Sequence, residues 1–338
     1  MRVIRALTLV FAITLVSGCS LGQPAEPTAI PTASGVPAPT ARPTPSTPLA
    51  VLIVPKDMDK VLSDAYQSTV YNLAQGSNLR FQVRNAFTTG DLDPSLKIVV
   101  ALPPDPGIAA LAAAAPKVQF LAINIPGITA GNNVSTLATN SRVDVSAFVA
   151  GYTAAMLSDD YRAGMIMPKD DAIAQAAAAA FANGMAYYCG MCGQFLQYGV
   201  PFPQFVAIPA ADAPTRLGGW ANFLVGTQKV NAVYVYPDPK VGVQQLYDAL
   251  GQTGVQIISV TVPNPKPAGW VMAIRPDEVK AIQSAWPMLL AGQGGQAVPS
   301  PLGLAEVDPS FLSLGKERLV QQVLDDLQSG RLATGVSQ

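Results

Sequence analysis

The sequence predicts an α/β protein of two lobes, each with a parallel β-sheet flanked by helices. Three observations carry this prediction. Short apolar runs end at prolines or turns, which is typical of strands buried on both faces. Helical segments alternate with these runs and indicate right-handed β-α-β units. The series is too long for one compact sheet and divides into halves that meet near residues 140–145. A single (β/α)₈ barrel is the alternative.

The elements follow in order along each half. The first half opens with the strand PLAVLIVP at residues 48–55 and a helix at about 58–75, followed by the strands LRFQV, LKIVVALP and KVQFLAIN. The second half opens with a helix at 146–157, where Phe148, Tyr152 and Met156 have helical spacing. Its strands RAGMIMP, FPQFVAIP, VNAVYVYP and VQIISVTVP are again separated by helical segments.

The N-terminus has the pattern of a bacterial lipoprotein signal over residues 1–18. Two arginines precede the apolar stretch ALTLVFAITLV, which is too short to span a bilayer, and Ser17 and Gly18 precede Cys19. We therefore expect cleavage before Cys19 and its lipidation, for example with palmitate. The protein would then be anchored to the cell membrane on its extracytoplasmic face. An ordinary secretory signal with an incidental cysteine is the alternative.

A proline-rich tether is expected at residues 19–47. Proline interrupts helices and strand ladders, and the accompanying alanine, threonine and serine cannot fill a core. Beyond it, we expect lobe 1 to comprise residues 48–144 with about 265–305. Lobe 2 would comprise residues 145–262 with about 306–335.

Composition excludes several functions. The formal net charge of −1 gives no basic field for nucleic acid. The chain has 0 histidines, which removes the commonest general base and metal ligand. We therefore expect no enzyme, cofactor or metal site, and a surface hydrolase is the least favoured function. Cys189 and Cys192 form a C-x₂-C pair, for which a local disulfide is the plain interpretation outside the cytoplasm.

Several segments resemble a known family. The stretch from Val143 to Ile166 contains Phe148, Ala150 and Gly151 before the strand Ala163–Ile166; Ala180–Gly184 lies further on, and Asp59-Lys60 and Ala65-Tyr66 lie near the start. Along the chain these segments cover most of Pro48 to Gly335. Their order resembles that of the basic membrane lipoproteins, the PnrA-like solute-binding lipoproteins of ABC-type nucleoside uptake systems. The resemblance implies a type I periplasmic-binding-protein fold, an interlobe purine-nucleoside site and an ABC permease as partner.

The expected ligand residues depart from the family pattern. Leu62 stands where the family has a phenylalanine that stacks on the base, and Ser63 where it has asparagine. Asn124 replaces an acidic residue, and Thr261 replaces the aspartate that would hold the ribose. Threonine cannot reproduce the two hydrogen bonds that a carboxylate accepts from hydroxyl groups. Tyr236 and Arg275 stand where the family has an aromatic residue and a lysine. The predicted ligand residues are Asp59, Asn124, Tyr236, Asp238, Trp270 and Arg275.

Each prediction has a structural alternative. Tyr236 would stack on a ring and Asp238 accept hydrogen bonds, or Asp238 would cap the next helix. Trp270 would replace the stacking lost at Leu62 or would pack the hinge. Arg275 would clamp a polar group or pair with Asp277. Asp59 would contact ligand or serve as a cap at a helix start.

Two functions fit these features. The first is a lipid-anchored solute-binding protein that delivers a small polar ligand, with a nucleoside implied by the resemblance, to an ABC permease. The alternative is a sensor or envelope interaction module that keeps the fold but has lost or changed the ligand pocket.

Overall fold

The computed structural model describes residues 47–138, 142–190, 201–212 and 214–336. Several predicted features lie outside the described residues: the signal peptide, all but the last residue of the tether, the expected lipidation at Cys19 and the expected disulfide partner Cys192. Cys189 is disulfide-bonded. Within the described ranges, none of the helices combines the length and the apolar character needed to cross a membrane.

The first sheet has six strands in the order β11-β5-β4-β3-β1-β2, all parallel. Side chains alternate between its faces, so Ala50 and Leu52 pack with α1 and α7, whereas Leu49, Val51 and Ile53 pack with α2. Both faces are thus covered. The elements of this unit are β1 (Leu49–Ile53), α1 (Lys60–Gly76), β2 (Arg80–Arg84), β3 (Leu96–Ala101), α2 (Ile108–Ala114), β4 (Gln119–Ala122), β5 (Val134–Ala138), α7 (Glu278–Leu290) and β11 (Ala297–Pro299).

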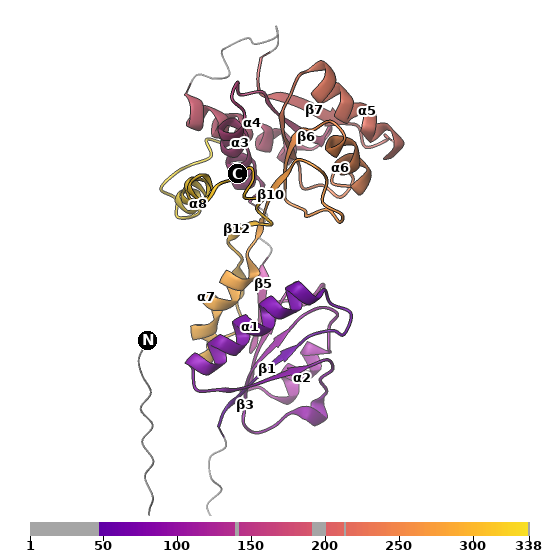
Figure 1. Ribbon diagram of the computed structural model, residues 1–338. Helices are drawn as coiled ribbons and strands as arrows, with labels where there is room; N and C mark the ends of the chain where they lie inside the picture. The colour runs from indigo at the N-terminus through magenta and orange to yellow at the C-terminus, as the bar shows by residue number, and fades with distance from the viewer. Residues whose placement is uncertain (1–46, 139–141, 191–200, 213, 337–338) are drawn as a thin grey trace, which may run out of the picture. The chain divides into compact units, whose positions relative to one another are not determined.

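The second sheet has six strands in the order β12-β10-β9-β8-β6-β7. All neighbours are parallel except β12, which runs antiparallel to β10. Helices α3, α4 and α8 cover one face and α5 and α6 the other (Figure 1). The elements are α3 (Val143–Leu157), β6 (Ala163–Pro168), α4 (Ala172–Cys189), β7 (Gln204–Ile208), α5 (Leu217–Asn222), β8 (Ala232–Val235), α6 (Gln244–Gly251), β9 (Gln256–Ser259), β10 (Trp270–Pro276), β12 (Leu302–Ala305) and α8 (Leu314–Gln328).

The chain passes between the two sheets three times: from β5 to α3, from β10 to α7, and from β11 to β12. In each sheet, the first five strands along the chain, β1–β5 and β6–β10, are parallel and follow the doubly wound order 2-1-3-4-5. Two such units joined by three passages are the predicted type I periplasmic-binding-protein-like fold, and the single barrel is excluded. Sheet membership also divides the expected lobe 1 segment 265–305. Strands β10 and β12 belong to the second sheet, whereas α7 and β11 complete the first unit.

Helices α3 and α4 approach each other unusually closely at two glycines. A Cβ at Gly151 would lie 2.0 Å from the carbonyl oxygen of Phe181, and a Cβ at Gly184 would lie 2.0 Å from that of Phe148. The relation is reciprocal, because each glycine meets the backbone that lies three residues before the other glycine. The absence of a side chain at both positions is therefore what lets the two helices pack.

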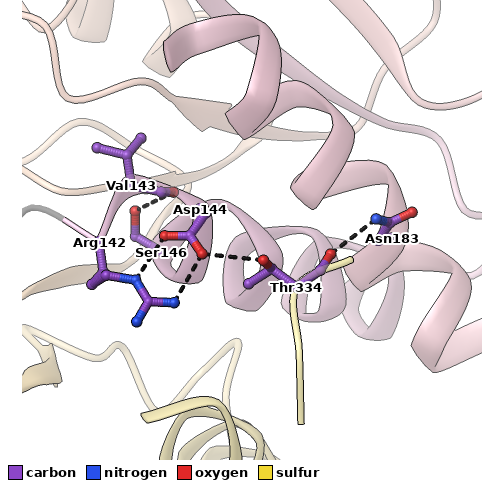
Figure 2. Close-up of polar contacts among 6 residues, drawn as sticks. All are labelled: Arg142, Val143, Asp144, Ser146, Asn183 and Thr334. Carbon is purple, nitrogen blue, oxygen red and sulfur yellow. Dashed lines mark hydrogen bonds and ion pairs between the residues drawn. The ribbon is translucent and has the colours of Figure 1, made fainter. Parts of the chain in front are cut away.

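An ion pair at the start of α3 fixes the C-terminal segment (Figure 2). Asp144 accepts hydrogen bonds from Arg142 Nε and Nη2, both at 3.0 Å, and from Thr334 Oγ1 at 3.1 Å. The Thr334 carbonyl accepts another from Asn183 Nδ2 on α4 at 2.9 Å. Burial by itself would raise the pKa of Asp144, but the Arg142 hydrogen bond and charge outweigh it, and the pKa lies below its ordinary value.

Candidate functional site

Each sheet has a hollow at the carboxyl ends of its parallel strands. The first hollow, about 410 Å³, adjoins the segments that follow β1, β3 and β4. The second, about 710 Å³, adjoins the segments that follow β6, β7 and β8. Each lies where the strand order reverses, between β1 and β3 or between β6 and β8. This is where open α/β sheets place their ligands.

The first hollow has an apolar wall supplied mainly by α1. Met58, Leu62 and Tyr66 line it from this side, and Leu102 and Ile123 line it at the strand ends. The helix is fixed at its start by the N-cap Asp59, whose Oδ1 accepts a hydrogen bond from Leu62 N at 3.0 Å. The cap therefore positions an apolar side chain, Leu62, that remains 37% exposed at the hollow.

The same hollow has a polar side formed by Asn124, Glu278 and Arg275. Asn124 follows β4 in a left-handed conformation, with φ of 50°, and its Nδ2 donates a hydrogen bond to Glu278 Oε1. Glu278 is the first residue of α7, whose N-cap Asp277 accepts from Lys280 N at 3.0 Å. Burial raises the pKa of Glu278. No ion pair joins Glu278 or Arg275 to any other residue in the described ranges.

The second hollow is lined by Asp171 and Asp238, among other charged residues. Asp171 caps α4 through Oδ1, which accepts from Ile173 N at 2.8 Å, while its Oδ2 accepts from Tyr236 Oη at 3.3 Å. Burial and the neighbouring Asp171 raise the pKa of Tyr236 to about 12. Asp238 does not cap α6; its Oδ1 accepts from Lys240 N at 2.7 Å within a turn.

Trp270 lies at a third hollow, of about 430 Å³. The residue is 4% exposed and packs in the core between the second sheet and α5 and α6. Its indole Nε1 donates to the Glu306 carbonyl at 2.9 Å, beside the Lys266–Glu306 ion pair at 2.7 Å. Burial of the ring therefore leaves no face of it open for stacking.

The structure groups the predicted site residues unequally. Asn124 and Arg275 line the first hollow, and Asp59 caps the helix that supplies its apolar wall. Asp238 lines the second, where Tyr236 contacts Asp171. Trp270 lies apart from both. A role for these six in ligand binding stays a prediction.

Sequence reasoning missed Glu278 and Asp171. Both signals were present in the sequence. Asp171 follows a predicted strand, and Glu278 follows the segment WVMAIRPD, whose apolar run ends in the same way as the other strands. The rule that ligands lie beyond the carboxyl ends of parallel strands would have found them. Arg275 was considered as a partner for Asp277, but Asp277 caps α7 and lies 3.8 Å from Lys280 Nζ.

Thr261, which stands where the resembled family has a ribose-binding aspartate, is engaged within its own unit. Its Oγ1 lies 2.8 Å from Tyr247 Oη, which lies 2.6 Å from Ser259 Oγ. A hydroxyl network of this kind uses the polar groups of Thr261 locally. Among the residues that the structure describes, no group of histidine, cysteine or acidic side chains is arranged to hold a metal ion.

Comparison with known proteins gives structural likenesses only. No known family and no curated protein matches the sequence. A transcriptional activator of the comK gene from Bacillus halodurans is 13% identical, with a TM-score of 0.47, over 83% of this chain and 98% of its own. An ABC transporter solute-binding protein from Aeropyrum pernix K1 is 14% identical, with a TM-score of 0.44, over 85% of this chain and 93% of its own.

A further solved structure is an ABC transporter solute-binding protein from Agrobacterium vitis, bound with α-D-tagatopyranose. It is 12% identical, with a TM-score of 0.40, over 80% of this chain and 98% of its own. Identities and scores this low carry no argument about the ligand, and the fold described above rests on the two sheets themselves.

Proposed function

We propose that this protein is an extracytoplasmic solute-binding protein, held at the cell membrane by a lipid on Cys19, that serves an ABC-type uptake system. One observation carries the proposal. The hollow at the carboxyl edge of the first sheet is lined by elements of that sheet and also by Arg275 and Gly303–Ala305 from β10 and β12 of the second. A ligand held there contacts both units at the chain passages that join them, which is how a binding protein couples occupancy to hinge movement.

The lining supports reversible binding. Apolar side chains remove ligand surface from water, and the amide, carboxylate and guanidinium of Asn124, Glu278 and Arg275 orient polar groups. The volume of about 410 Å³ falls within the range for small-molecule sites. The expected non-enzymatic role is consistent with such a lining, which needs no bond chemistry to act.

The resemblance adds a purine nucleoside as a candidate ligand. Tyr236 is the predicted stacking residue for that ligand, but its side chain is buried and its hydroxyl donates to Asp171, which counts against a nucleoside. Asp238 lines the second hollow and would accept hydroxyl hydrogen bonds there. The changed positions favour the second candidate function, a sensor or envelope interaction module with an altered pocket. Leu62 has no aromatic ring that could stack on a base, and the hydroxyl of Thr261 is hydrogen-bonded to Tyr247.

A thermal-shift panel of nucleosides, bases, sugars and amino acids on the full chain tests solute binding. Binding stabilises the folded state by about 2.7 kcal/mol when the ligand is at a hundredfold excess over its Kd, and the melting temperature rises accordingly. No response to any member of the panel would reject solute binding and favour the interaction module. If a nucleoside binds, Tyr236→Ala and Trp270→Ala test the stacking role, and unchanged affinity in both removes it.

The anchor needs a separate experiment. The full chain and its Cys19→Ser variant are expressed in a bacterium, labelled with palmitate, and fractionated. We expect label and membrane association for the natural chain and loss of both in the variant. Membrane association without label, unchanged in Cys19→Ser, would contradict lipidation.

A further inference from the structure

We propose that the hollow at the first sheet binds a small zwitterionic solute of the amino-acid class, with its ammonium group at Glu278, its carboxylate at Arg275 and its apolar side chain against Leu62. This assignment rests on the proposed solute-binding function and specifies the ligand class. Three features of the hollow carry it. A carboxylate and a guanidinium each form no ion pair among the residues that the structure describes, and an apolar wall lies between α1 and the strand ends.

The negative end of the site is Glu278. It is fixed by its place at the start of α7, and Asn124 donates a hydrogen bond to Oε1. A carboxylate has further lone pairs that accept hydrogen bonds, and no lysine or arginine in the described ranges forms an ion pair with it. Glu278 is partly buried, and this burial raises its pKa. A ligand ammonium supplies both the charge and the donors.

The positive end is Arg275, at the end of β10. Its neighbour Asp277 is used as the cap of α7 and pairs with Lys280, so the guanidinium is not neutralised by the acidic residue closest in sequence. Guanidinium presents a planar fork of donors that matches a carboxylate. The residue is exposed and lines the same hollow as Glu278. The hollow therefore offers one guanidinium, Arg275, and two carboxylates, of which Asp277 caps α7 and pairs with Lys280 while Glu278 has no such cation.

The rest of the lining fits a small aliphatic group better than a base. Met58, Leu62 and Leu304 are partly or fully exposed and give branched or flexible apolar surface. The aromatic residue of the lining, Tyr66, is only 3% exposed, so its ring face is not open for stacking. A neutral nucleoside would also leave both charges without a partner, which costs binding energy when groups are desolvated.

Calorimetric titration of the full chain with L-leucine, 4-methylpentanoate and 3-methylbutylamine tests the assignment. The second probe lacks the ammonium group and the third lacks the carboxylate, while the branched alkyl group is shared. We expect leucine to bind and each single-charge probe to bind at least about tenfold more weakly, because each probe loses the charge-assisted hydrogen bonds of one charged group. Equal affinity for all three probes would overturn the proposal. This series uses the natural chain and needs no variant to fold.

Variants locate the site. Glu278→Gln and Arg275→Gln should each weaken leucine about tenfold or more, and Glu278→Gln should narrow the gap between leucine and 4-methylpentanoate. Glu317→Gln and Arg318→Gln are matched controls, because Glu317 lies in the first turn of α8 as Glu278 does in α7 and neither control lines the hollow. Leucine affinity that is unchanged in both test variants would place the ligand elsewhere.

An adenosine arm separates this proposal from the proposed function. Adenosine binding without leucine binding would overturn the zwitterion assignment and leave solute binding standing. Failure of every probe, together with a silent thermal-shift panel, would reject solute binding itself.

Discussion

The crossing of α3 and α4 allows a sharp test of how the second unit is held together. Gly151→Ala and Gly184→Ala each add one methyl group at a point where a Cβ would lie 2.0 Å from a backbone carbonyl oxygen. Ordinary carbon contacts are at about 3.5–4.0 Å, so the helices must separate locally by more than about 1 Å. Neither clash can be relieved by a side-chain rotation, because the obstructing atoms belong to the opposing backbone.

The expected cost follows from that separation. A gap of about 0.5–1 Å forfeits about a quarter to a half of the dispersion energy of each facing contact. Overpacking of a close-packed core costs about 1–3 kcal/mol, whereas alanine is better than glycine by about 1 kcal/mol in a helix. Because rigid backbone lies on both sides, we expect a net loss of about 2 kcal/mol for each variant. The double variant should cost less than the sum, because one displacement relieves both clashes.

Urea denaturation followed by circular dichroism measures these losses. Gly219→Ala is the matched control, since Gly219 lies in helix α5 and an added Cβ would meet nothing within 4 Å. We expect the control to raise the midpoint slightly and both test variants to lower it, with an unchanged slope. Test variants as stable as the control, or strictly additive losses in the double variant, would refute the packing argument.

Three further predictions concern polar groups. Glu278→Gln should be more stable than the natural chain at pH 7 but not at pH 4. Burial raises the pKa of Glu278, so the natural chain loses stability as the pH rises from 4 to 7 and the carboxyl ionises. A difference in urea midpoints that is the same at both pH values would contradict this. Asp144→Asn should lower the stability of the fold at pH 7. Because the pKa of the natural carboxyl is lowered, the variant should also lose less stability than the natural chain between pH 7 and pH 3. Parallel curves of stability against pH for the two proteins would argue against this. Asn133→Asp should cost about 1–3 kcal/mol by denaturation, because the Nδ2 of Asn133 donates to three backbone carbonyls and a carboxylate cannot; a neutral effect would sink that interpretation.

The layered architecture was predictable because each unit is built from local patterns. Apolar runs such as PLAVLIVP read as strands buried on both faces, and both sheets do have helices on both sides. The placement of β10 and β12 was harder. Strand membership at a passage between sheets depends on partners that are far away in sequence. Ala273, for example, pairs with both Ser259 and Ala305.

The site was predictable only in part, because its residues come from sequence-distant elements. Asn124 was expected from a strand end, but its partner Glu278 comes from the segment after the second passage. Trp270 was chosen for its flat aromatic surface, yet the ring is buried in the core with α5 and α6, and its indole N–H donates to the Glu306 carbonyl. The side-chain type indicates which contacts a residue can make, whereas burial decides which of those contacts remain open to a ligand.

The residues behind the family resemblance have a physical role of their own. At the α3–α4 crossing, Gly151 meets the backbone of Phe181, and Gly184 meets the backbone of Phe148. A pattern of this kind reports how two helices meet, and it says nothing about the solute. Membership of the basic membrane lipoprotein family therefore stays a prediction, and the ligand has to be argued from the hollows.

The arrangement of the last strands has a consequence for synthesis on the ribosome. The first sheet receives β11 and the second receives β12 from a stretch of only a few residues near the end of the chain, and Trp286 of α7 donates to Ser77 Oγ at 3.0 Å across more than half of the protein. A nascent chain stalled before α7 thus exposes unpaired edges on both units at once. Neither sheet is complete until β11 and β12 have been synthesised, so a chain that terminates before α7 leaves both sheets without an edge strand.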